Sequence, residues 1–368
     1  MKVCILAPIH IWSDIRVFKK QAITLYKMGF DVTQICKCEK EEIKYGIRLK
    51  SSLVCNKNKL TRMLLTPFLF IQCLKENADI YHCHNPDTLM TVFILRLLGK
   101  KVIYDTHEDF SLRILFKEWI PKPLRKVIAL IISSTEKLAS HCSNHTFVTQ
   151  ERMLKRLSKK TSLLGNLPIL SEVELNTKSE LNKEFRLVYL GLINESRGIL
   201  NIIQALELCN EKEGIDVRFW LIGNIEPKFM AKLELEKGWQ YVDYLSYLPQ
   251  SEAFEKVCES DLGMIYIHDV GDHKYTDPNK MYEYMMFKKP FIASDFDDWK
   301  KKLHGIDCGW FLKPNQSRLL SELIVDIVLN QKDEVIARGD IGYEFIKNNN
   351  WKKEEELMKS VYIDIVGA

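Results

Sequence analysis

Short apolar runs rich in β-branched residues alternate with helix-length segments along most of the chain. In the first half these runs lie at residues 2–7, 31–36, 80–83, 101–104 and 146–148. Between them, segments such as 15–28 and 124–139 have apolar residues at the three- and four-residue spacing that is typical of helices. Strands that alternate with helices predict βαβ units and a parallel sheet.

A polar segment, residues 166–185, interrupts this alternation and predicts a linker between two domains. The apolar runs then resume at 186–190, 217–222, 241–244, 262–267 and 291–293. Near the end of the chain, Leu357, Val361 and Ile365 are four residues apart and predict the apolar stripe of one helix. We therefore expect an α/β protein with two Rossmann-like doubly wound domains, residues 1–165 and 186–345, and a terminal helical segment, residues 346–368. A cleft between two such domains can hold a donor on one wall and an acceptor on the other.

Length and composition agree with a two-domain globular protein, because 368 residues with 46% hydrophobic and 28% charged residues exceed one ordinary core. The ten cysteines have no pairing or zinc-binding spacing, which favours reduced thiols in a cytosol. The opening run predicts a strand and no signal peptide, and every apolar run is shorter than the roughly 18 residues that span a bilayer. We expect a cytoplasmic protein.

The charge is unevenly distributed along the chain. Residues 1–170 hold 28 Lys and Arg against 14 Asp and Glu, a net charge of +14, whereas residues 171–368 have a net charge of −10. A basic half favours an anionic partner such as a membrane surface, a lipid-linked phosphate or a nucleic acid. Residues 121–137 mix apolar residues with Lys122, Arg125 and Lys126. This helix either lies at an anionic membrane surface or packs on the core with one side exposed to solvent. We expect peripheral contact with the inner face of the plasma membrane.

Polar residues follow three predicted strands of the first half, where a doubly wound domain binds its ligands. Asp14 and Arg16 follow the first strand, His84 and Asn85 a later one, and His107 and Glu108 the next. We expect these residues on the cleft wall. Their spacing matches no metal motif, and we predict no metal site. A G-x-G-x-x-G fingerprint is absent from the sequence, which disfavours a dinucleotide dehydrogenase.

In the second half, two segments are suited to a nucleotide diphosphate. The loop Gly191–Gly198 joins a strand to a helix, where backbone N–H groups and Arg197 can bind an anion. Gly223 ends the following strand. Pro278 is suited to the first turn of a helix, and Lys280 then lies in that turn, where a cation is unfavourable unless an anion is bound. Glu283, one turn later, could accept hydrogen bonds from ribose hydroxyls.

The order and placement of these motifs resemble the family 4 glycosyltransferases of the GT-B fold, in the bacterial surface-polysaccharide branch. The resemblance covers nearly the whole chain. It rests on the opening strand with Asp14 and Arg16, the His-Asn-Pro-Asp loop at 84–87, Tyr-Asp-Thr-His-Glu-Asp at 104–109, the Gly…Arg-Gly loop at 191–198 and Pro-Asn-Lys-Met-Tyr-Glu-Tyr-Met at 278–285. It implies that the terminal helix crosses back to the N-terminal domain. It also implies retaining hexosyl transfer without a metal or other cofactor.

The resemblance implies a role for each candidate residue. Arg197 and Lys280 would bind the donor diphosphate and stabilise the leaving group, and His107 would contact the donor sugar; these three are the predicted catalytic residues. Glu283 matches the second Glu of the family's E-x7-E pattern and would hold the ribose. The remaining predicted donor residues are Gly191, Gly198, Gly223 and Asn279, and the predicted acceptor or cleft residues are Asp14, Arg16, His84, Asn85, Glu108 and Tyr275.

Two positions depart from the family pattern. Tyr275 stands where the first Glu of E-x7-E is usual, and Leu192 stands where the family often has Arg or Lys. We interpret these departures as a subtype in which Arg197 and Lys280 are the main phosphate cations.

Family frequency favours a UDP-sugar donor, and the expected acceptor is a glycan or a lipid-linked sugar. Two alternatives are a catalytically silent GT-B scaffold, suggested by Tyr275 and Leu192, and a nucleotide-sugar epimerase of the same fold. The epimerase would need further acid–base carboxylates, which the sequence does not single out. A nucleic-acid binder would explain the basic half, but the chain has no recognisable binding motif, so we expect no nucleic-acid partner.

Overall fold

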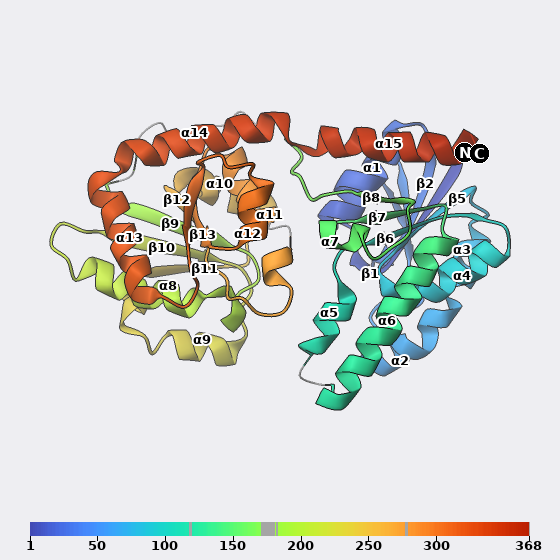
Figure 1. Ribbon diagram of the computed structural model, residues 1–368, viewed down its shortest axis with the longest axis horizontal. Helices are drawn as coiled ribbons and strands as arrows, with labels where there is room; N and C mark the ends of the chain where they lie inside the picture. The colour runs from blue at the N-terminus through green and yellow to red at the C-terminus, as the bar shows by residue number, and fades with distance from the viewer. Residues whose placement is uncertain (118–119, 171–180, 182, 277–278, 368) are drawn as a thin grey trace. The chain divides into compact units, whose positions relative to one another are not determined.

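The computed structural model describes residues 1–117, 120–170, 181, 183–276 and 279–367, and the chain divides into two compact units. Unit 1 comprises Met1–Ile169 and Trp351–Ala368, and unit 2 comprises Leu170–Asn350. Each unit has one largely parallel sheet with helices packed on it (Figure 1). The expected α/β class with two Rossmann-like domains is confirmed.

The sheet of unit 1 has the strand order β3-β4-β2-β1-β5-β6-β7-β8. Its strands are β1 (Lys2–Ile11), β2 (Asp31–Lys37), β3 (Glu42–Lys44), β4 (Ile47–Ser51), β5 (Ile80–His84), β6 (Lys101–Thr106), β7 (His145–Val148) and β8 (Thr161–Leu163). All neighbours are parallel except β3 and β4, which form a hairpin. Because β1 lies between β2 and β5, the chain reverses direction across the sheet at β1, and ligands bind at such a switch point.

The helices of unit 1 cover both faces of this sheet. They are α1 (Ile23–Lys27), α2 (Lys59–Leu65), α3 (Leu69–Lys75), α4 (Leu89–Leu97), α5 (Phe110–Leu115), α6 (Lys122–Cys142), α7 (Glu151–Leu154) and α15 (Trp351–Gly367). Alternate residues of β1 enter different cores: Val3 and Ile5 contribute to one cluster, and Cys4 and Leu6 to the other. The helix predicted over residues 15–28 is instead a π-helical segment, Ile15–Ala22, followed by the short α1.

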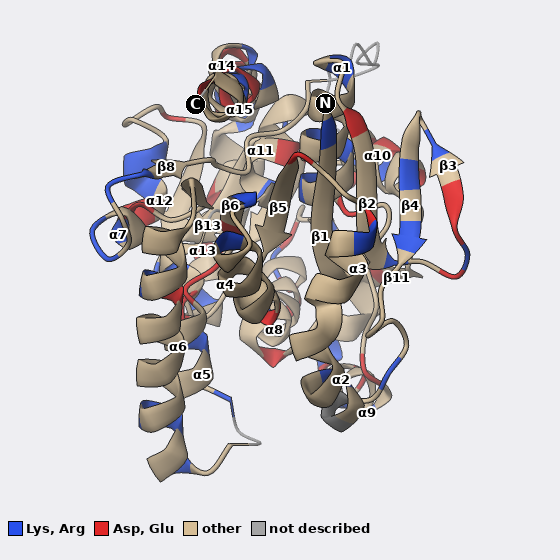
Figure 2. Ribbon diagram, turned by 90° about the vertical axis from the view of Figure 1, so that its right-hand side faces the viewer, with Lys and Arg blue, Asp and Glu red and all other residues tan. Residues whose placement is uncertain are grey.

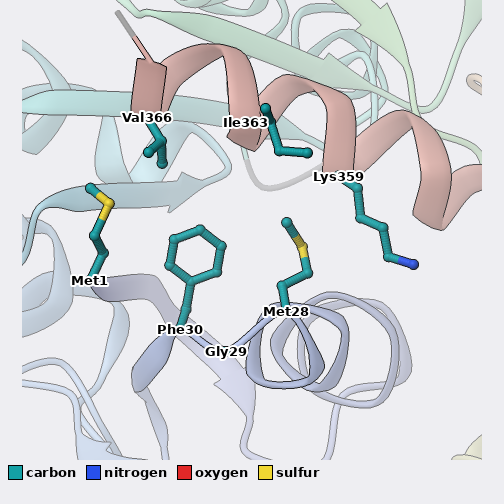
Figure 3. A pocket seen from close by; sticks show the side chains of 7 residues that line it. All are labelled: Met1, Met28, Gly29, Phe30, Lys359, Ile363 and Val366. Atoms are coloured by element: carbon teal, nitrogen blue, oxygen red, sulfur yellow. The ribbon is translucent and has the colours of Figure 1, made fainter.

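Helix α15 packs into the core of unit 1, as expected for the terminal helix. Its buried residues Trp351, Met358, Val361, Tyr362 and Ile365 join the cluster that contains Val3 and Ile5. The backbone N–H of Trp351 donates to the carbonyl of Pro168 at 2.7 Å, which fixes the start of the helix. Figure 3 shows an apolar pocket of about 450 Å³ beside α15, lined by Met1, Met28, Gly29, Phe30, Lys359, Ile363 and Val366.

The sheet of unit 2 has the strand order β11-β10-β9-β12-β13-β14, and every pair is parallel. Its strands are β9 (Phe185–Leu190), β10 (Val217–Ile222), β11 (Val242–Ser246), β12 (Leu262–Ile265), β13 (Phe291–Ser294) and β14 (Gly309–Leu312). Its helices are α8 (Ile199–Asn210), α9 (Pro227–Leu233), α10 (Gln250–Glu259), α11 (Asn279–Met286), α12 (Asp297–Lys302), α13 (Ser317–Asn330) and α14 (Lys332–Asn348). Here β9 lies between β10 and β12, so the switch point is at the carboxyl end of β9.

Two features bear on the expected boundaries. Helix α14 continues to Asn348, so residues 346–348 end this helix and do not begin the terminal one. Residues 171–180 and 182 of the expected linker, together with Asp277 and Pro278 before α11, lie outside the described residues.

All ten cysteines are free, and seven of them are buried. Among the helices formed by the described residues, none is both long and apolar enough to cross a bilayer.

Candidate active site

A buried carboxylate, Asp105 at the end of β6, organises the loops at the switch point of unit 1. The guanidinium of Arg16 donates through Nη2 to its Oδ1 at 3.1 Å and its Oδ2 at 3.2 Å. The amide Nε2 of Gln21 donates to Oδ2 at 2.6 Å. Arg16 and Gln21 are five residues apart on the π-helical segment, whose wider turn brings them to the same side.

The same guanidinium also holds the segment after β8. Its Nη1 donates to the carbonyls of Leu164 at 2.9 Å and Gly165 at 3.1 Å and to Oδ1 of Asn166 at 3.1 Å. Burial by itself raises the pKa of Asp105, but Arg16 and the neighbouring histidines outweigh it and hold the pKa well below its usual range. Asp105 is therefore a fixed negative charge at neutral pH.

Three histidine rings surround this carboxylate. The ring nitrogen of each histidine nearest to the carboxylate is Nε2 of His82 at 3.6 Å, Nε2 of His107 at 3.6 Å and Nδ1 of His84 at 3.9 Å. His84 Nδ1 and His107 Nε2 are 3.0 Å apart and share one proton in a hydrogen bond. Burial lowers the pKa of His84 well below its usual range and the pKa of His107 to about 3. Both rings are neutral at physiological pH, so His107 can exchange a hydrogen bond with a sugar hydroxyl but adds no charge.

His82, His84 and Asp105 place one nitrogen or oxygen atom each within 4.8 Å of one another, a spacing that could hold a metal ion. The Asp105 carboxylate, however, already accepts hydrogen bonds from Arg16 and Gln21. A divalent ion would have to displace the guanidinium or lie beside its positive charge. The donor set therefore does not fit a metal, and we assign none.

The predicted cleft residues of unit 1 differ in exposure, and Asn85, Arg16 and His84 are all buried. Asp14, Asn85 and His107 lie together at the ends of β1, β5 and β6, where the side-chain Oδ1 of Asn85 accepts from the backbone N–H of His107 at 3.1 Å. Glu108 is half-buried and forms an ion pair with Arg113. Arg16 and His84 are buried within the unit, and their direct contact with a substrate stays a prediction.

Beside this group, a pocket of about 580 Å³ opens at the carboxyl ends of β1 and β2. Its lining includes the ring of Trp12, the hydroxyl of Ser13 and three lysines, Lys37, Lys40 and Lys44. The Nζ of Lys44 lies 3.8 Å from the centre of the Trp12 ring. Glu39 and Glu42 also line it, and Lys44 pairs with Glu42 at 3.2 Å. An aromatic residue among charged side chains of both signs is suited to a polar ligand of sugar size.

In unit 2, two glycines bring the backbone of neighbouring strand ends into close contact. Gly191 follows β9 with a φ of 140°, and Gly223 follows β10 with a φ of 147°. A Cβ atom on Gly223 would lie 1.8 Å from the carbonyl oxygen of Gly191, so a side chain is excluded there. Gly198, directly after Arg197, has a φ of 68° and is the N-cap of α8.

The ammonium of Lys280 lies directly over Gly191. A Cβ atom on Gly191 would be 2.6 Å from both Cε and Nζ of Lys280, and Nζ is 5.5 Å from the centre of the Tyr189 ring. Burial lowers the pKa of Lys280, Glu283 raises it, and Arg197 lowers it further. The Nε of Arg197 is buried and donates no hydrogen bond among the described residues. Lys280 thus lies on a glycine backbone at the switch point, with Arg197 near enough to affect its pKa, which is an arrangement suited to a diphosphate.

The other residues of unit 2 that the sequence singled out lie on α11 and on two loops. Asn279 is exposed at the start of α11, and Glu283 is half-buried one turn after Lys280. Tyr275 ends a short 3-10 turn, His273–Tyr275, and its ring lies 5.4 Å from the Nζ of Lys274. Leu192 is exposed, and its carbonyl accepts a hydrogen bond from the Tyr189 hydroxyl at 2.8 Å.

Comparison with known proteins bears on the family and the fold of the chain. Residues 16–162 match the sequence profile of the family described as Glycosyltransferase Family 4. The resemblance to family 4 glycosyltransferases is confirmed. A search of curated protein sequences found no significant match.

Several solved structures share the GT-B fold over the whole chain. Sucrose-phosphate synthase from Thermosynechococcus elongatus has a TM-score of 0.76 at 13% identity, with 100% of this chain and 99% of that chain covered. The E. coli trehalose-6-phosphate structure bound with UDP-2-fluoro glucose has a TM-score of 0.72 at 12% identity, with 99% of each chain covered. Anabaena Alr3699/HepE in complex with UDP and glucose has a TM-score of 0.69 at 12% identity, with 99% and 100% covered. At such identities the likeness establishes the GT-B fold alone.

The sequence did not single out several residues on which the site of unit 1 depends. Asp105, Gln21 and His10 were not predicted as site residues; Asp105 and His10 lie near the ends of β6 and β1, and Gln21 lies in the π-helical segment. Tyr362 of α15 donates to or accepts from His82 Nδ1 at 2.8 Å and so joins the terminal helix to the cluster. A buried polar residue inside an apolar helix stripe is the signal that could have found Gln21 and Tyr362.

Proposed function

We propose that this chain is a retaining glycosyltransferase that moves a hexosyl residue from a nucleotide-diphosphate sugar to a glycan or lipid-linked acceptor in cell-surface polysaccharide synthesis. A UDP-sugar is the favoured donor, since two of the solved GT-B structures described above are complexes with UDP or a UDP-sugar. The observation that carries the proposal is the position of Lys280 over Gly191, beside Arg197.

The reaction breaks the bond between the anomeric carbon and the diphosphate oxygen and forms a bond from that carbon to an acceptor hydroxyl oxygen. The acceptor proton is released, and negative charge accumulates on the leaving diphosphate. Lys280 and Arg197 would stabilise this charge without a metal, and such preorganised groups are often the largest catalytic contribution. Glu283 would bind the ribose hydroxyls, and neutral His107 would hydrogen-bond the transferred sugar.

For the acceptor, the pocket at the ends of β1 and β2 is the best-suited site in unit 1. Its Trp12 ring can pack against a sugar face, and Ser13 is followed directly by Asp14 of the histidine group. Lys37 and Lys40 are exposed at its rim and could approach the phosphate of a lipid-linked acceptor.

The surface of α6 supports peripheral membrane contact on the cytoplasmic side. Five apolar side chains of this helix are 51–68% exposed: Leu124, Val127, Leu130, Ile131 and Leu138. Their spacing places them along one side of the helix, and Lys122, Lys126 and Lys137 are exposed on the same helix. Figure 2 shows Lys and Arg along α6 among residues that are mostly uncharged. An apolar stripe with basic neighbours is typical of helices that lie in an anionic membrane interface.

A thermal-shift screen against UDP-, GDP-, dTDP- and ADP-sugars with EDTA present tests the donor site. A nucleotide at about 100-fold excess over its dissociation constant should add about 2.7 kcal/mol of stability. We expect a shift with UDP-sugars that Lys280→Ala abolishes. A shift that requires a divalent metal would contradict metal independence, and no shift with any nucleotide sugar would contradict the donor site.

Product analysis separates the alternatives. A silent scaffold would bind the nucleotide sugar without turnover, and an epimerase would change the sugar of the nucleotide without an acceptor. The proposed enzyme should release nucleoside diphosphate in step with acceptor glycosylation, and NMR of the product should give the same anomeric configuration as the donor.

A further inference from the structure

A chain of three hydrogen bonds joins the loops that follow β1, β5 and β6. Oδ2 of Asp14 is 3.0 Å from Nδ1 of His10, and Nε2 of His10 is 2.8 Å from Nδ2 of Asn85. Oδ1 of Asn85 is 3.1 Å from the backbone nitrogen of His107. The chain ends at the residue expected to contact the donor sugar.

The direction of each bond follows from the last one. The backbone N–H of His107 can only donate, so the atom of Asn85 that faces it is the amide oxygen. The amide nitrogen of Asn85 then donates to His10, whose Nε2 must accept and carry no proton. The one proton of a neutral His10 ring is therefore on Nδ1, from which it donates to the Asp14 carboxylate.

Asn85 is held in a conformation that its surroundings determine. Its φ of 65° lies in the left-handed region, which a non-glycine residue adopts only at some cost. Its backbone N–H donates to the Asp105 carbonyl at 2.8 Å, and its carbonyl accepts from the Thr88 hydroxyl at 2.8 Å. Backbone and side chain are both fixed in a residue that is only 4% exposed.

We propose that Asp14, His10 and Asn85 form a directional relay that positions His107, and that Asn85 acts as a positioning residue for the transfer reaction. The relay fixes the backbone of His107, and His84 fixes its ring from the other side. The test by activity rests on the proposed glycosyltransferase function. The test by NMR of the histidine rings does not depend on that function.

The substitution Asn85→Asp tests the direction of the relay. A carboxylate still accepts from the backbone of His107 but cannot donate to His10, so the His10 ring must carry protons on both nitrogens. The charged and titratable groups that face His10 among the described residues are Asp14, Asp87, His84 and His107. We expect the ratio of variant to wild-type kcat/KM to fall about tenfold per pH unit once the pH exceeds the ionisation of this imidazolium.

A double variant and a control variant distinguish loss of the relay from a general loss of structure or activity. In Asp14→Asn/Asn85→Asp the donor and the acceptor change places, so a neutral ring again suffices and the added pH dependence should disappear. The amide oxygen introduced at position 14 can still accept from the backbone N–H of Val17, as Oδ1 of Asp14 does at 2.9 Å in the wild type. Asn77→Asp is the matched control, because Asn77 is also left-handed, with a φ of 44°, but is exposed.

Nitrogen-15 NMR of the histidine rings provides the readout that needs no activity. In the wild type we expect a protonated Nδ1 and a bare Nε2 at His10, and in Asn85→Asp two protonated nitrogens. A wild-type His10 protonated on Nε2 would overturn the relay even if transfer is observed. An Asn85→Asp variant with the wild-type pH profile would also overturn it, whereas a correct tautomer without any transfer would contradict only the proposed function.

Discussion

The two candidate sites occupy the same place in their sheets but treat buried charge in opposite ways. In unit 1 the buried Asp105 meets the buried Arg16 and Gln21, so the negative charge is compensated within the unit. In unit 2 burial lowers the pKa of the Lys280 ammonium, the Glu283 carboxylate raises it, and the Arg197 guanidinium lowers it further, so that the pKa stays below its ordinary value.

This difference assigns different roles to the two sites. A buried ion pair with several further hydrogen bonds is a support that holds loops in one arrangement. A buried ammonium whose pKa is lowered by burial and by a second cation is an unfavourable arrangement that an anion would relieve. We therefore infer that the site of unit 1 positions groups, and we propose that the site of unit 2 binds a negatively charged ligand. Substitutions should therefore affect stability in unit 1 and binding in unit 2.

The largest effect is expected from breaking the pair in unit 1. Arg16→Met leaves the Asp105 carboxylate buried without its counter-charge, which typically costs about 3–5 kcal/mol of unfolding free energy. Chemical denaturation measures this loss. The double variant Arg16→Met/Asp105→Leu removes both charges and should recover most of the stability. If the free energy of unfolding of Arg16→Met lies within about 1 kcal/mol of the wild-type value, the pair does not support the fold.

The converse is expected in unit 2. Lys280→Met removes one of the two cations and should lower kcat/KM about 100-fold or more, by the magnitude typical of a lost charge-stabilising group. Because burial of the ammonium is itself unfavourable, the unfolding free energy of the variant should stay equal or increase. Lys288→Met is the control, since Lys288 pairs with Asp340 at the surface of the same unit. Parallel losses of activity and stability in Lys280→Met would show that Lys280 is structural.

Much of this fold could be predicted from the sequence, because buried parallel strands leave continuous apolar runs. Ten expected runs correspond to β1, β2, β5, β6 and β7 and to β9–β13. The strands β3, β4 and β8 were missed because they are short and have few apolar residues, and β14 was missed because it is an edge strand of only four residues. The π-helical segment was missed because its turn is set by Arg16 and Gln21 reaching Asp105, which is a contact between distant segments.

The candidate sites were predictable only where local chain geometry determines them. The position of Lys280 in the first turn of α11 could be predicted, because a cation at a helix N-terminus is unfavourable unless an anion is bound. The relay through His10 and the pairing of Arg16 with Asp105 join residues 75 and 89 positions apart, so no local pattern indicates them. Arg16 was expected on the cleft wall; it lies buried in an ion pair with Asp105, and its contact with a substrate stays a prediction.

The contrast between a basic first half and an acidic second half predicts a smaller effect at the surface. Leu130→Ser/Ile131→Ser in α6 removes two exposed apolar side chains, each of which could contribute about 1 kcal/mol or more at a membrane interface. We expect at least about tenfold weaker sedimentation with vesicles that contain anionic phospholipid. Leu235→Ser, at an exposed position of unit 2, is the control. Equal binding by the α6 variant and the control would assign the stripe to a protein partner or to no partner.

The smallest expected effect is a pH dependence of stability that arises from buried histidines of unit 1. Burial lowers the pKa of His84 and His107 below the ordinary value near 6.5 of an unfolded chain, so these rings must lose their protons on folding. Their contribution to stability is fully present above about pH 6.5 and is lost as the pH falls below that value towards the folded pKa, because the unfolded state then binds more protons. Between pH 6.5 and 5.5 each ring should lower the free energy of unfolding by about 1 kcal/mol. Unfolding of wild type and of His84→Gln at both pH values measures this loss, which should be smaller in the variant because one buried ring is gone. A pH dependence identical in the two proteins would mean that His84 titrates as an ordinary exposed histidine and that the cluster around Asp105 opens readily to water.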